Sequence, residues 1–452
     1  MTSAEIGGSS RSCPFHAVGV GVDVKRGRGS AYRRLRRDPL GLFVELKRTQ
    51  GDVARARLGR RDFFLVSHPD DIQRVLVSNV RDYDPDDFAY KSWRRSPRPP
   101  ARGFLRVESL DDHLRARRLL QPPFRKARLD AYWPSLVAAT NRALDRWRPD
   151  TTFEVRREMK TLTVALFAET VFGEALDPER EGLLDHIARC LEVDEFASSP
   201  SRELVNRLRI PRLIRLSASL EALLEVIGRL IEARRAEGGG GDDAISTLLR
   251  GAAEQGLEDR EVALAAAGLL FAAADTTATA ISWSLYLLLR DPAALERVCA
   301  EAEAPTGPED LPFTRAATTE AIRLYPPSWR IVNSARVDHV LRGRSIAAGS
   351  NVWVSPYVVQ RDARWYDEPD EFRPERWLDG SSASRPKLSF VAFGAGPHKC
   401  IGEELAWREL AAIVPAVVRR FDLRLASTDE IRPRAALTLE PAGGVPVQVA
   451  ER

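Results

Sequence analysis

The stretch FGAGPHKCIG, residues 393–402, decides the fold, because it places Cys400 directly before an apolar helical pattern. Two glycines and a proline precede the cysteine, which indicates a tight loop dense in backbone groups. Apolar residues then recur at helical spacing from Ile401 to about residue 418. Cys400 is therefore expected at a helix N-terminus, where unpaired N–H groups favour the thiolate over the thiol. A lone cysteine is more often an inert core residue, so the interpretation depends on motifs elsewhere in the chain.

A charged pair lies upstream, in the segment EAIR that ends just before two prolines. Glu320 and Arg323 are three residues apart and share one face of the predicted helix. Taken alone, such a pair is usually a solvated surface salt bridge. The segment FRPERW, residues 372–377, adds Arg376 downstream. These charged residues indicate a function only when they are considered together with the motif around Cys400 that follows them.

The longest apolar stretch runs from Val262 to Leu289 and contains one formal charge, Asp275. A stretch of this length could span a bilayer, but a lone acid at mid-span is costly in lipid. We therefore expect a helix from Glu258 to Arg290 buried in the core of the protein. Its centre, AAADTT, contains Thr276 beside the acid. A threonine there can also simply hydrogen-bond a preceding carbonyl and bend the helix, which is the alternative to a catalytic role.

Composition narrows the classes of function. The 452 residues carry a formal charge of +4, and the basic residues are spread along the chain, so nucleic-acid binding is not indicated. The first fifteen residues have no apolar core, which argues against a signal peptide or a membrane anchor. The cysteines lie far apart without a CxxC pair, which favours a reducing cytoplasm over a disulfide framework. They are Cys13, Cys190, Cys299 and Cys400.

The pattern along the chain predicts a mainly α protein with minor β structure (α+β). We see no internal repeat or linker, so residues 31–452 are predicted to form one catalytic domain after a flexible leader of residues 1–30. Helices are expected at Pro39–Gln50, His68–Leu76 and, nearly continuously, Asp111–Arg235. Strands are expected at Val53–Leu58, Phe63–Val66, Asn351–Val354 and Val445–Val449, and a long loop at Val80–Val107.

Together the motifs resemble those of the cytochrome P450 family, soluble bacterial type. The decapeptide matches FGxGxHxCxG, EAIR matches ExxR, FRPERW resembles FxPxRW, and AAADTT resembles AGxDTT. The segment HLRARR, residues 113–118, resembles HxxxRR. These motifs occur in the family's order from about residue 35 to the end. The resemblance implies the cytochrome P450 fold, with a helix-rich domain and a small N-terminal β-rich region.

The resemblance also implies roles for individual residues. Cys400 would be the axial thiolate of haem b, Phe393 would pack on the sulfur side, and Gly394 and Gly396 would shape the loop. His113, Arg117 and His398 would bind the haem propionates. Glu320, Arg323 and Arg376 would lock the chain that leads into residues 393–400, the cysteine loop. Thr276 would help hold dioxygen, and Asp275 would relay protons.

Two positions depart from the family pattern. Ala273 stands where the family usually has glycine, and its methyl group narrows the oxygen groove. Asn333 stands where many relatives have another propionate-binding arginine. Either Arg330 or Arg336 replaces that arginine, or the contact is lost.

The resemblance implies a monooxygenase that inserts one oxygen atom from O₂ into a hydrophobic small molecule, a terpenoid in preference to a fatty acid or polyketide. Electrons would come from NAD(P)H through ferredoxin reductase and ferredoxin, since about fifty residues after Cys400 are too few for a flavin domain. A basic docking face and solvated surface charge are equally good explanations of Arg115, Arg118, Lys126 and Lys399. The family's layout points to a substrate pocket formed by Phe88, Tyr90, Trp93, Phe104, Phe196, Leu269, Leu270, Ala273, Ile331 and Val332.

Two other functions remain as alternatives. A haem-thiolate peroxygenase or isomerase would not use external electrons, and the presence of both Asp275 and Thr276 speaks against it. A haem-based gas sensor or carrier would not need this acid–alcohol pair and normally has a partner module.

Overall fold

The computed structural model describes residues 30–58, 61–85, 109–173, 182–197, 211–238, 240–303 and 307–452. Its helices are α1 (Ser30–Arg37), α2 (Pro39–Gln50), α3 (Pro69–Gln73), α5 (Leu110–Leu120), α6 (Lys126–Leu144), α7 (Val155–Val171), α8 (Leu183–Ala197), α10 (Pro211–Ala236), α11 (Ala244–Gln255), α12 (Asp259–Arg290), α13 (Pro292–Glu301), α14 (Pro312–Leu324), α15 (Pro356–Val359) and α16 (Glu403–Arg420). Its strands are β1 (Val53–Leu58), β2 (Arg61–Val66), β3 (Tyr83–Pro85), β4 (Thr151–Glu154), β5 (Ile331–Ala335), β6 (His339–Leu341), β7 (Arg344–Ile346), β8 (Asn351–Val354), β9 (Phe421–Leu425), β10 (Pro433–Ala435), β11 (Leu439–Pro441) and β12 (Pro446–Glu451).

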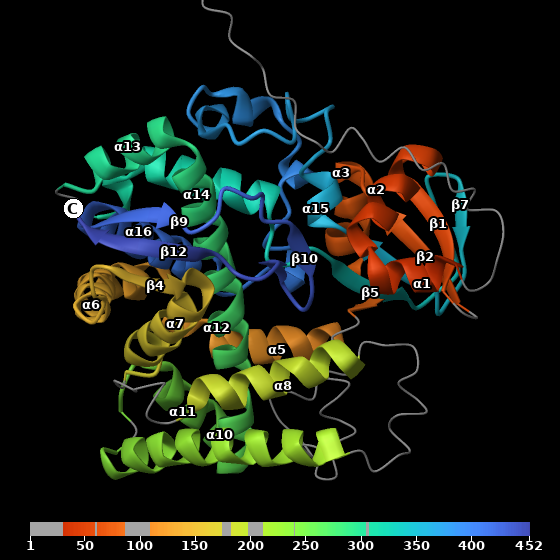
Figure 1. The fold of residues 1–452 in the computed structure, drawn as a ribbon. Helices are drawn as coiled ribbons and strands as arrows, with labels where there is room; N and C mark the ends of the chain where they lie inside the picture. The colour runs from red at the N-terminus through yellow and green to blue at the C-terminus, as the bar shows by residue number, and fades with distance from the viewer. Residues whose placement is uncertain are drawn as a thin grey trace, which may run out of the picture.

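Helix α12 runs through the centre of the helical part of the molecule (Figure 1). Glu258 caps its N-terminus, and α7, α10, α11, α14 and α16 all pack against it. Among the described residues it alone is long and apolar enough to cross a bilayer, yet most of its side chains are buried against these neighbours. The prediction of a buried core helix is confirmed.

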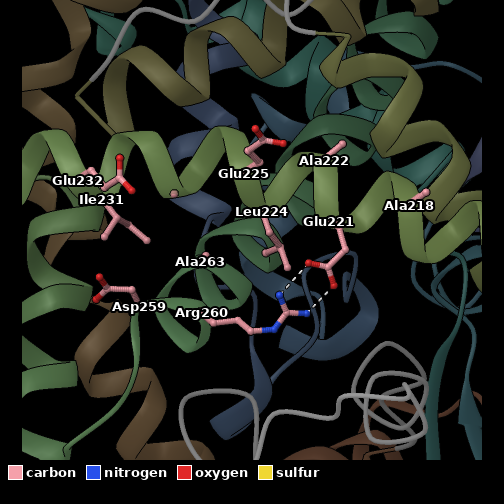
Figure 2. Close-up of a pocket in the computed structure, with 11 residues that line it drawn as sticks. Ala218, Glu221, Ala222, Leu224, Glu225, Ile231, Glu232, Asp259, Arg260 and Ala263 are labelled. Atoms are coloured by element: carbon pink, nitrogen blue, oxygen red, sulfur yellow. Dashed lines mark hydrogen bonds and ion pairs between the residues drawn. The ribbon is translucent and has the colours of Figure 1, made fainter.

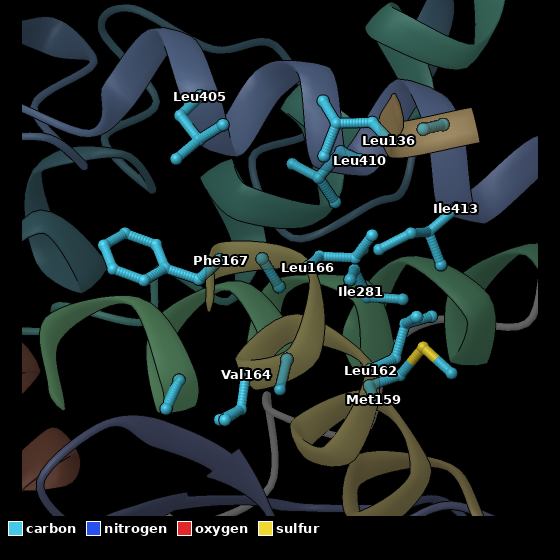
Figure 3. Close-up of a cluster of buried hydrophobic side chains, with 14 of the residues drawn as sticks. Leu136, Met159, Leu162, Val164, Leu166, Phe167, Ile281, Leu405, Leu410 and Ile413 are labelled. Atoms are coloured by element: carbon cyan, nitrogen blue, oxygen red, sulfur yellow. The ribbon is translucent and has the colours of Figure 1, made fainter. Parts of the chain in front are cut away.

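The main core joins α6, α7 and α16 to α12. Figure 3 shows Leu136 of α6, Leu166 and Phe167 of α7, Ile281 of α12 and Ile413 of α16 converging in one cluster. All five side chains are almost completely buried. Each such side chain contributes about 1.5–3 kcal/mol of transfer free energy, so this cluster fixes α12 relative to the helix that follows Cys400.

The strands gather mainly in a small region beside the helices (Figure 1). Five strands form a sheet in the order β1-β2-β8-β5-β3, in which only β2 and β8 pair in parallel. The others form a three-stranded sheet, β4-β12-β9, and two hairpins, β6–β7 and β10–β11. The predicted helix at Pro39–Gln50 and the strands at Val53–Leu58 and Asn351–Val354 are confirmed.

Three predictions of secondary structure from the sequence are wrong. Strand β3 lies where a loop was predicted, and β4 interrupts the region predicted to be helical, because each pairs with a strand far away in the sequence. The helix predicted to end at Leu76 instead changes into a π-helical turn, Arg74–Ser78. The predicted 1–30 leader lies outside the described residues except for Ser30.

Candidate active site

The cysteine loop closes tightly on itself just before α16. The N–H of Cys400 donates to the carbonyl of Phe393 at 2.8 Å, and α16 begins at Glu403. The Phe393 ring lies 5.2 Å from that of Trp407 on α16, measured between centroids. Cys400 as a whole residue is exposed to solvent, although protein atoms crowd its sulfur. A thiol is thus presented at the mouth of a helix, as the sequence predicts.

Two opposing effects act on the Cys400 sulfur. Burial by surrounding protein atoms raises the pKa of the thiol, and a hydrogen bond from the Gly402 backbone with the charges of Arg117 and Lys399 only partly lowers it. The net pKa lies above its usual value, because burial outweighs the backbone hydrogen bond that the helix terminus supplies. A cation bound to the sulfur would supply the missing stabilisation, because coordination deprotonates a thiol outright.

The two glycines of the loop adopt backbone conformations that other residues rarely take. Gly394 has a φ of +72° and Gly396 a φ of +64°. A Cβ atom on Gly396 would lie 2.2 Å from the carbonyl oxygen of Leu76, in the π-helical turn. The loop therefore depends on glycine here both for its conformation and for its close approach to the N-terminal region.

His113, Arg117 and His398 meet beside the loop. The rings of His113 and His398 are 4.0 Å apart between centroids, and Nε2 of His113 lies 3.0 Å from the carbonyl oxygen of Pro397. Arg117 donates to the carbonyl of Lys399 at 2.5 Å. Burial, together with the charges of His113 and Arg117, lowers the pKa of His398 to about 4. Helix α5 and the loop thus bring together donors that suit carboxylate groups.

Asn333 is buried in β5, where it pairs in register with Val352 of β8. Its Nδ2 atom has no hydrogen-bond partner among the described residues. Arg336 forms an ion pair with Asp84 at 3.2 Å, while Arg330 stacks over the rings of Trp329 and Trp353. An unpaired buried amide donor fits an acceptor absent from the protein itself, such as a propionate.

Asp275 points away from solvent into a cluster of polar groups. Its Oδ1 atom lies 2.8 Å from Arg156 and 2.6 Å from Lys160, both on α7, and Thr438 donates to its Oδ2 atom at 2.6 Å. Burial acts to raise the pKa of Asp275, but the two cations outweigh it and the pKa is lowered. Asp275 is therefore a carboxylate near neutral pH. Glu440 also contacts Arg156.

Thr276 lies on a less buried face of α12 with Leu269, Ala272 and Ala273. Its hydroxyl donates to the carbonyl of Ala272 at 2.7 Å. This is the local bond that the sequence allows as the alternative to a catalytic role. The face is apolar apart from this hydroxyl, within a helix that is otherwise largely buried.

The Glu320–Arg323 pair is completely buried, with 0% exposure of both side chains. Two parallel hydrogen bonds of 2.8 Å join them, and Arg376 adds a third contact to Glu320 at 2.9 Å. Trp377 also donates to Glu320 at 2.8 Å. Burial acts to raise the pKa of Glu320, but Arg323, Arg376 and the backbone N–H of Arg373 together outweigh it, and the pKa is lowered. The reading of this pair as a surface salt bridge is excluded.

Several pocket residues cannot be placed. Phe88, Tyr90, Trp93 and Phe104 lie outside the described residues, as does the side chain of Phe196. Leu270 is buried in the main core. Ile331 and Val332 pack in two different hydrophobic clusters, because neighbours on a strand point to opposite faces. Hence at most one of that pair can line a common pocket.

A groove of about 610 Å³ lies between α10 and the start of α12 (Figure 2). Arg260 and Glu221 form an ion pair across it at 2.6 Å. The residues that line this groove include neither Cys400 nor Thr276, and none of them was predicted as a site residue.

Comparison with known proteins identifies the family. A family model described as Cytochrome P450 matches residues 28–444. The chain belongs to the cytochrome P450 family. Cyclooctat-9-en-7-ol 5-monooxygenase of Streptomyces melanosporofaciens is 32% identical over 404 residues, 86% of each chain. Cyclooctatin synthase of the same organism is 30% identical, covering 89% of each chain. Pentalenene oxygenase of Streptomyces avermitilis is 28% identical, covering 91% of this chain and 92% of the relative.

The family membership confirms the predicted fold class and the activity of a cytochrome P450 monooxygenase. Cytochromes P450 are haem-thiolate proteins, and the residues around Cys400 fit that group. The fit rests on the thiol of Cys400, the donors of His113 and Arg117, and the unpaired amide of Asn333. Sequence reasoning missed Arg156, Lys160, Thr438 and Glu440, which no local motif marks.

Proposed function

We propose that this cytochrome P450 inserts one oxygen atom from O₂ into a terpenoid-like hydrocarbon in the cytoplasm, using haem b held by Cys400. The observation that carries the proposal is the thiol at the mouth of α16 beside the His113, Arg117 and His398 donors. The three relatives are named for cyclooctat-9-en-7-ol, cyclooctatin and pentalenene, which supports a largely hydrocarbon substrate. The apolar face of α12 suits such a molecule.

Haem, when bound, supplies the oxygen-activating redox chemistry, and the protein supplies binding, orientation and protons. Cys400 would hold the iron through its sulfur. His113, Arg117, His398 and the Asn333 amide would orient the propionates, while Phe393 would shield the sulfur. The face with Leu269 and Ala273 would hold the substrate away from water. Thr276 and Asp275 would bring protons to the reacting oxygen from the other side of α12.

Replacing Thr276 with alanine is expected to uncouple electron use from product formation. The product formed per NAD(P)H should fall about tenfold to a hundredfold, with hydrogen peroxide rising in step, because the hydroxyl that positions the proton is lost. Haem content should not change. The measurement compares NAD(P)H consumed, peroxide and product. Thr170→Ala is the matched control, since Thr170 makes the same backbone bond, to Leu166 at 2.6 Å, inside α7. Unchanged coupling in T276A would remove the proton-delivery role.

The substrate class is tested by screening terpenoids, fatty acids and polyketides for a shift in the iron spin state. Compounds that shift it are then turned over with ¹⁸O₂, and incorporation of one labelled atom into a terpenoid is the expected result. Labelled product from fatty acids alone would overturn the terpenoid assignment. Turnover that requires peroxide and ignores reduced ferredoxin would favour a peroxygenase, and ligand binding without any product would favour a sensor.

We place a ferredoxin, reduced by its reductase, at the face formed by Arg115, Arg118, Lys126 and Lys399. All four side chains are exposed, but Arg115, Lys126 and Lys399 form ion pairs with Asp112, Asp130 and Glu403. Arg118→Glu is expected to slow reduction by an acidic ferredoxin about tenfold at low salt, and less at high salt. Stopped-flow reduction measures this. Arg424→Glu, in an exposed pair with Asp422, is the control, and equal slowing in both variants would contradict the assigned face.

A further inference from the structure

Two buried carboxylates share one arginine beside the centre of α12. Asp275 and Glu440 have side-chain exposures of 5% each, and both contact the same Nη2 atom of Arg156. The distance from that atom to Asp275 is 2.8 Å. Because the same guanidinium nitrogen contacts both carboxylates, a stronger hydrogen bond to one weakens the hydrogen bond to the other.

The hairpin β10–β11 carries Glu440 and fastens it to α12. Besides its bond to Asp275, the Thr438 hydroxyl lies 3.3 Å from that of Thr279. Trp283 donates from its indole nitrogen to the carbonyl of Leu439 at 2.7 Å. Three turns of α12 therefore contact consecutive residues of the hairpin, which fixes Glu440 relative to Asp275.

The charges around Asp275 come from three elements. Helix α7 contributes Arg156 and Lys160, β10 contributes Arg434, which is paired with Glu440, and β11 contributes Glu440 itself. Arg434 is 59% exposed, so the chain of contacts from Arg434 through Glu440 and Arg156 runs from solvent to the buried Asp275. Burial raises the pKa of Glu440, and the charge of Asp275 adds to this effect. Because coupling between two charges is reciprocal, ionised Glu440 must also make Asp275 easier to protonate.

We propose that Glu440 and Thr438 are positioning residues that act in opposite directions on the Asp275 carboxylate and so set the pH at which this acid delivers protons. Glu440 competes with Asp275 for Arg156 and adds a negative charge nearby, and both effects favour protonation of Asp275. Thr438 donates to the carboxylate and stabilises its charge, which disfavours protonation. The inference rests on the proposed proton-delivery role of Asp275 and extends it to a hairpin that no motif marks.

The test measures coupled product formation against pH in haem-loaded variants. Glu440→Gln removes a negative charge, so the midpoint of the pH profile should move down by about one pH unit. Thr438→Val removes a donor to the carboxylate, so the midpoint should move up, and Thr438→Ser should restore it. Solvent isotope effects on product formation should change with the midpoint. Glu375→Gln, which removes one charge from an exposed pair with Arg297, is the control and should shift nothing.

The outcomes separate the inference from its premise. If Asp275→Asn leaves coupling unchanged, the proton-delivery role fails and the inference fails with it. If D275N uncouples the enzyme but E440Q and T438V leave the midpoint in place or move it in one direction, the inference alone is wrong. Should E440Q not bind haem, Arg434→Gln strengthens the hold of Glu440 on Arg156 and must raise the midpoint, and a midpoint that stays or falls overturns the inference.

Discussion

Serine in place of Cys400 should abolish monooxygenase activity while leaving the fold largely intact. A thiolate bound to the iron would push electron density onto it and favour oxygen activation, whereas a serine hydroxyl would be a far weaker donor. The substitution is nearly isosteric, and the loop is held by its backbone bond to Phe393 and by its two glycines, so the protein should still fold. The carbon monoxide difference spectrum of the reduced protein measures the change of ligand.

Cys299 provides the matched control for this substitution. It is also a free cysteine, but its sulfur lies against the carbonyl of Val418 at 3.6 Å, away from the loop. Cys299→Ser is expected to retain the spectrum and the activity of the parent protein. An unaltered Soret band in C400S, or purified protein that carries no porphyrin at all, would overturn the assignment of Cys400.

Truncating Arg323 to alanine is expected to destabilise the protein by about 3–5 kcal/mol, because it leaves the Glu320 carboxylate buried and unpaired. The loss extends beyond the ion pair. Arg323 also donates to the carbonyls of Gln360, Pro369 and Glu371 at 2.7, 2.6 and 3.1 Å, which hold the segment leading to the cysteine loop. Urea unfolding monitored by circular dichroism, together with haem content, measures the effect.

The exposed pair of Arg297 and Glu375 is the control for R323A. Its side chains are 48% and 57% exposed, so Arg297→Ala should cost less than about 1 kcal/mol. Arg323→Lys keeps the charge but lacks the planar fork, and its stability should lie between that of R323A and the parent. Equal stability losses in R323A and R297A would contradict the structural role of the buried pair.

The sequence predicted the elements whose structure depends on neighbouring residues, and it missed strands that depend on distant ones. The apolar stretch around Asp275 predicted α12 because its pattern is continuous over the whole helix. The loop before Cys400 was recognisable because glycine permits the positive φ angles that a tight loop needs, and proline fixes φ. Strands β3 and β4 were missed, since each is short and stable only through pairing with a distant strand.

The residues of the candidate site also fall into those predictable from nearby sequence and those that depend on distant contacts. Glu320 and Arg323 lie on one helix, so their pairing followed from spacing, but their complete burial depends on packing by a distant part of the chain. Arg156 reaches Asp275 across 119 positions and Glu440 comes from near the C-terminus, so no local pattern could join them. Burial of Cys400, which also depends on the whole fold, raises the pKa of its thiol more than the Gly402 backbone hydrogen bond lowers it.

The contact between Gly396 and the carbonyl of Leu76 has a consequence for biosynthesis. The ribosome makes Leu76 long before Gly396, so this close approach can form only after both segments have been made. The packing of the π-helical turn against the cysteine loop is therefore completed late in synthesis. Because Cys400 belongs to that loop, haem held by it would be captured late, and nascent chains stalled before the loop should remain colourless.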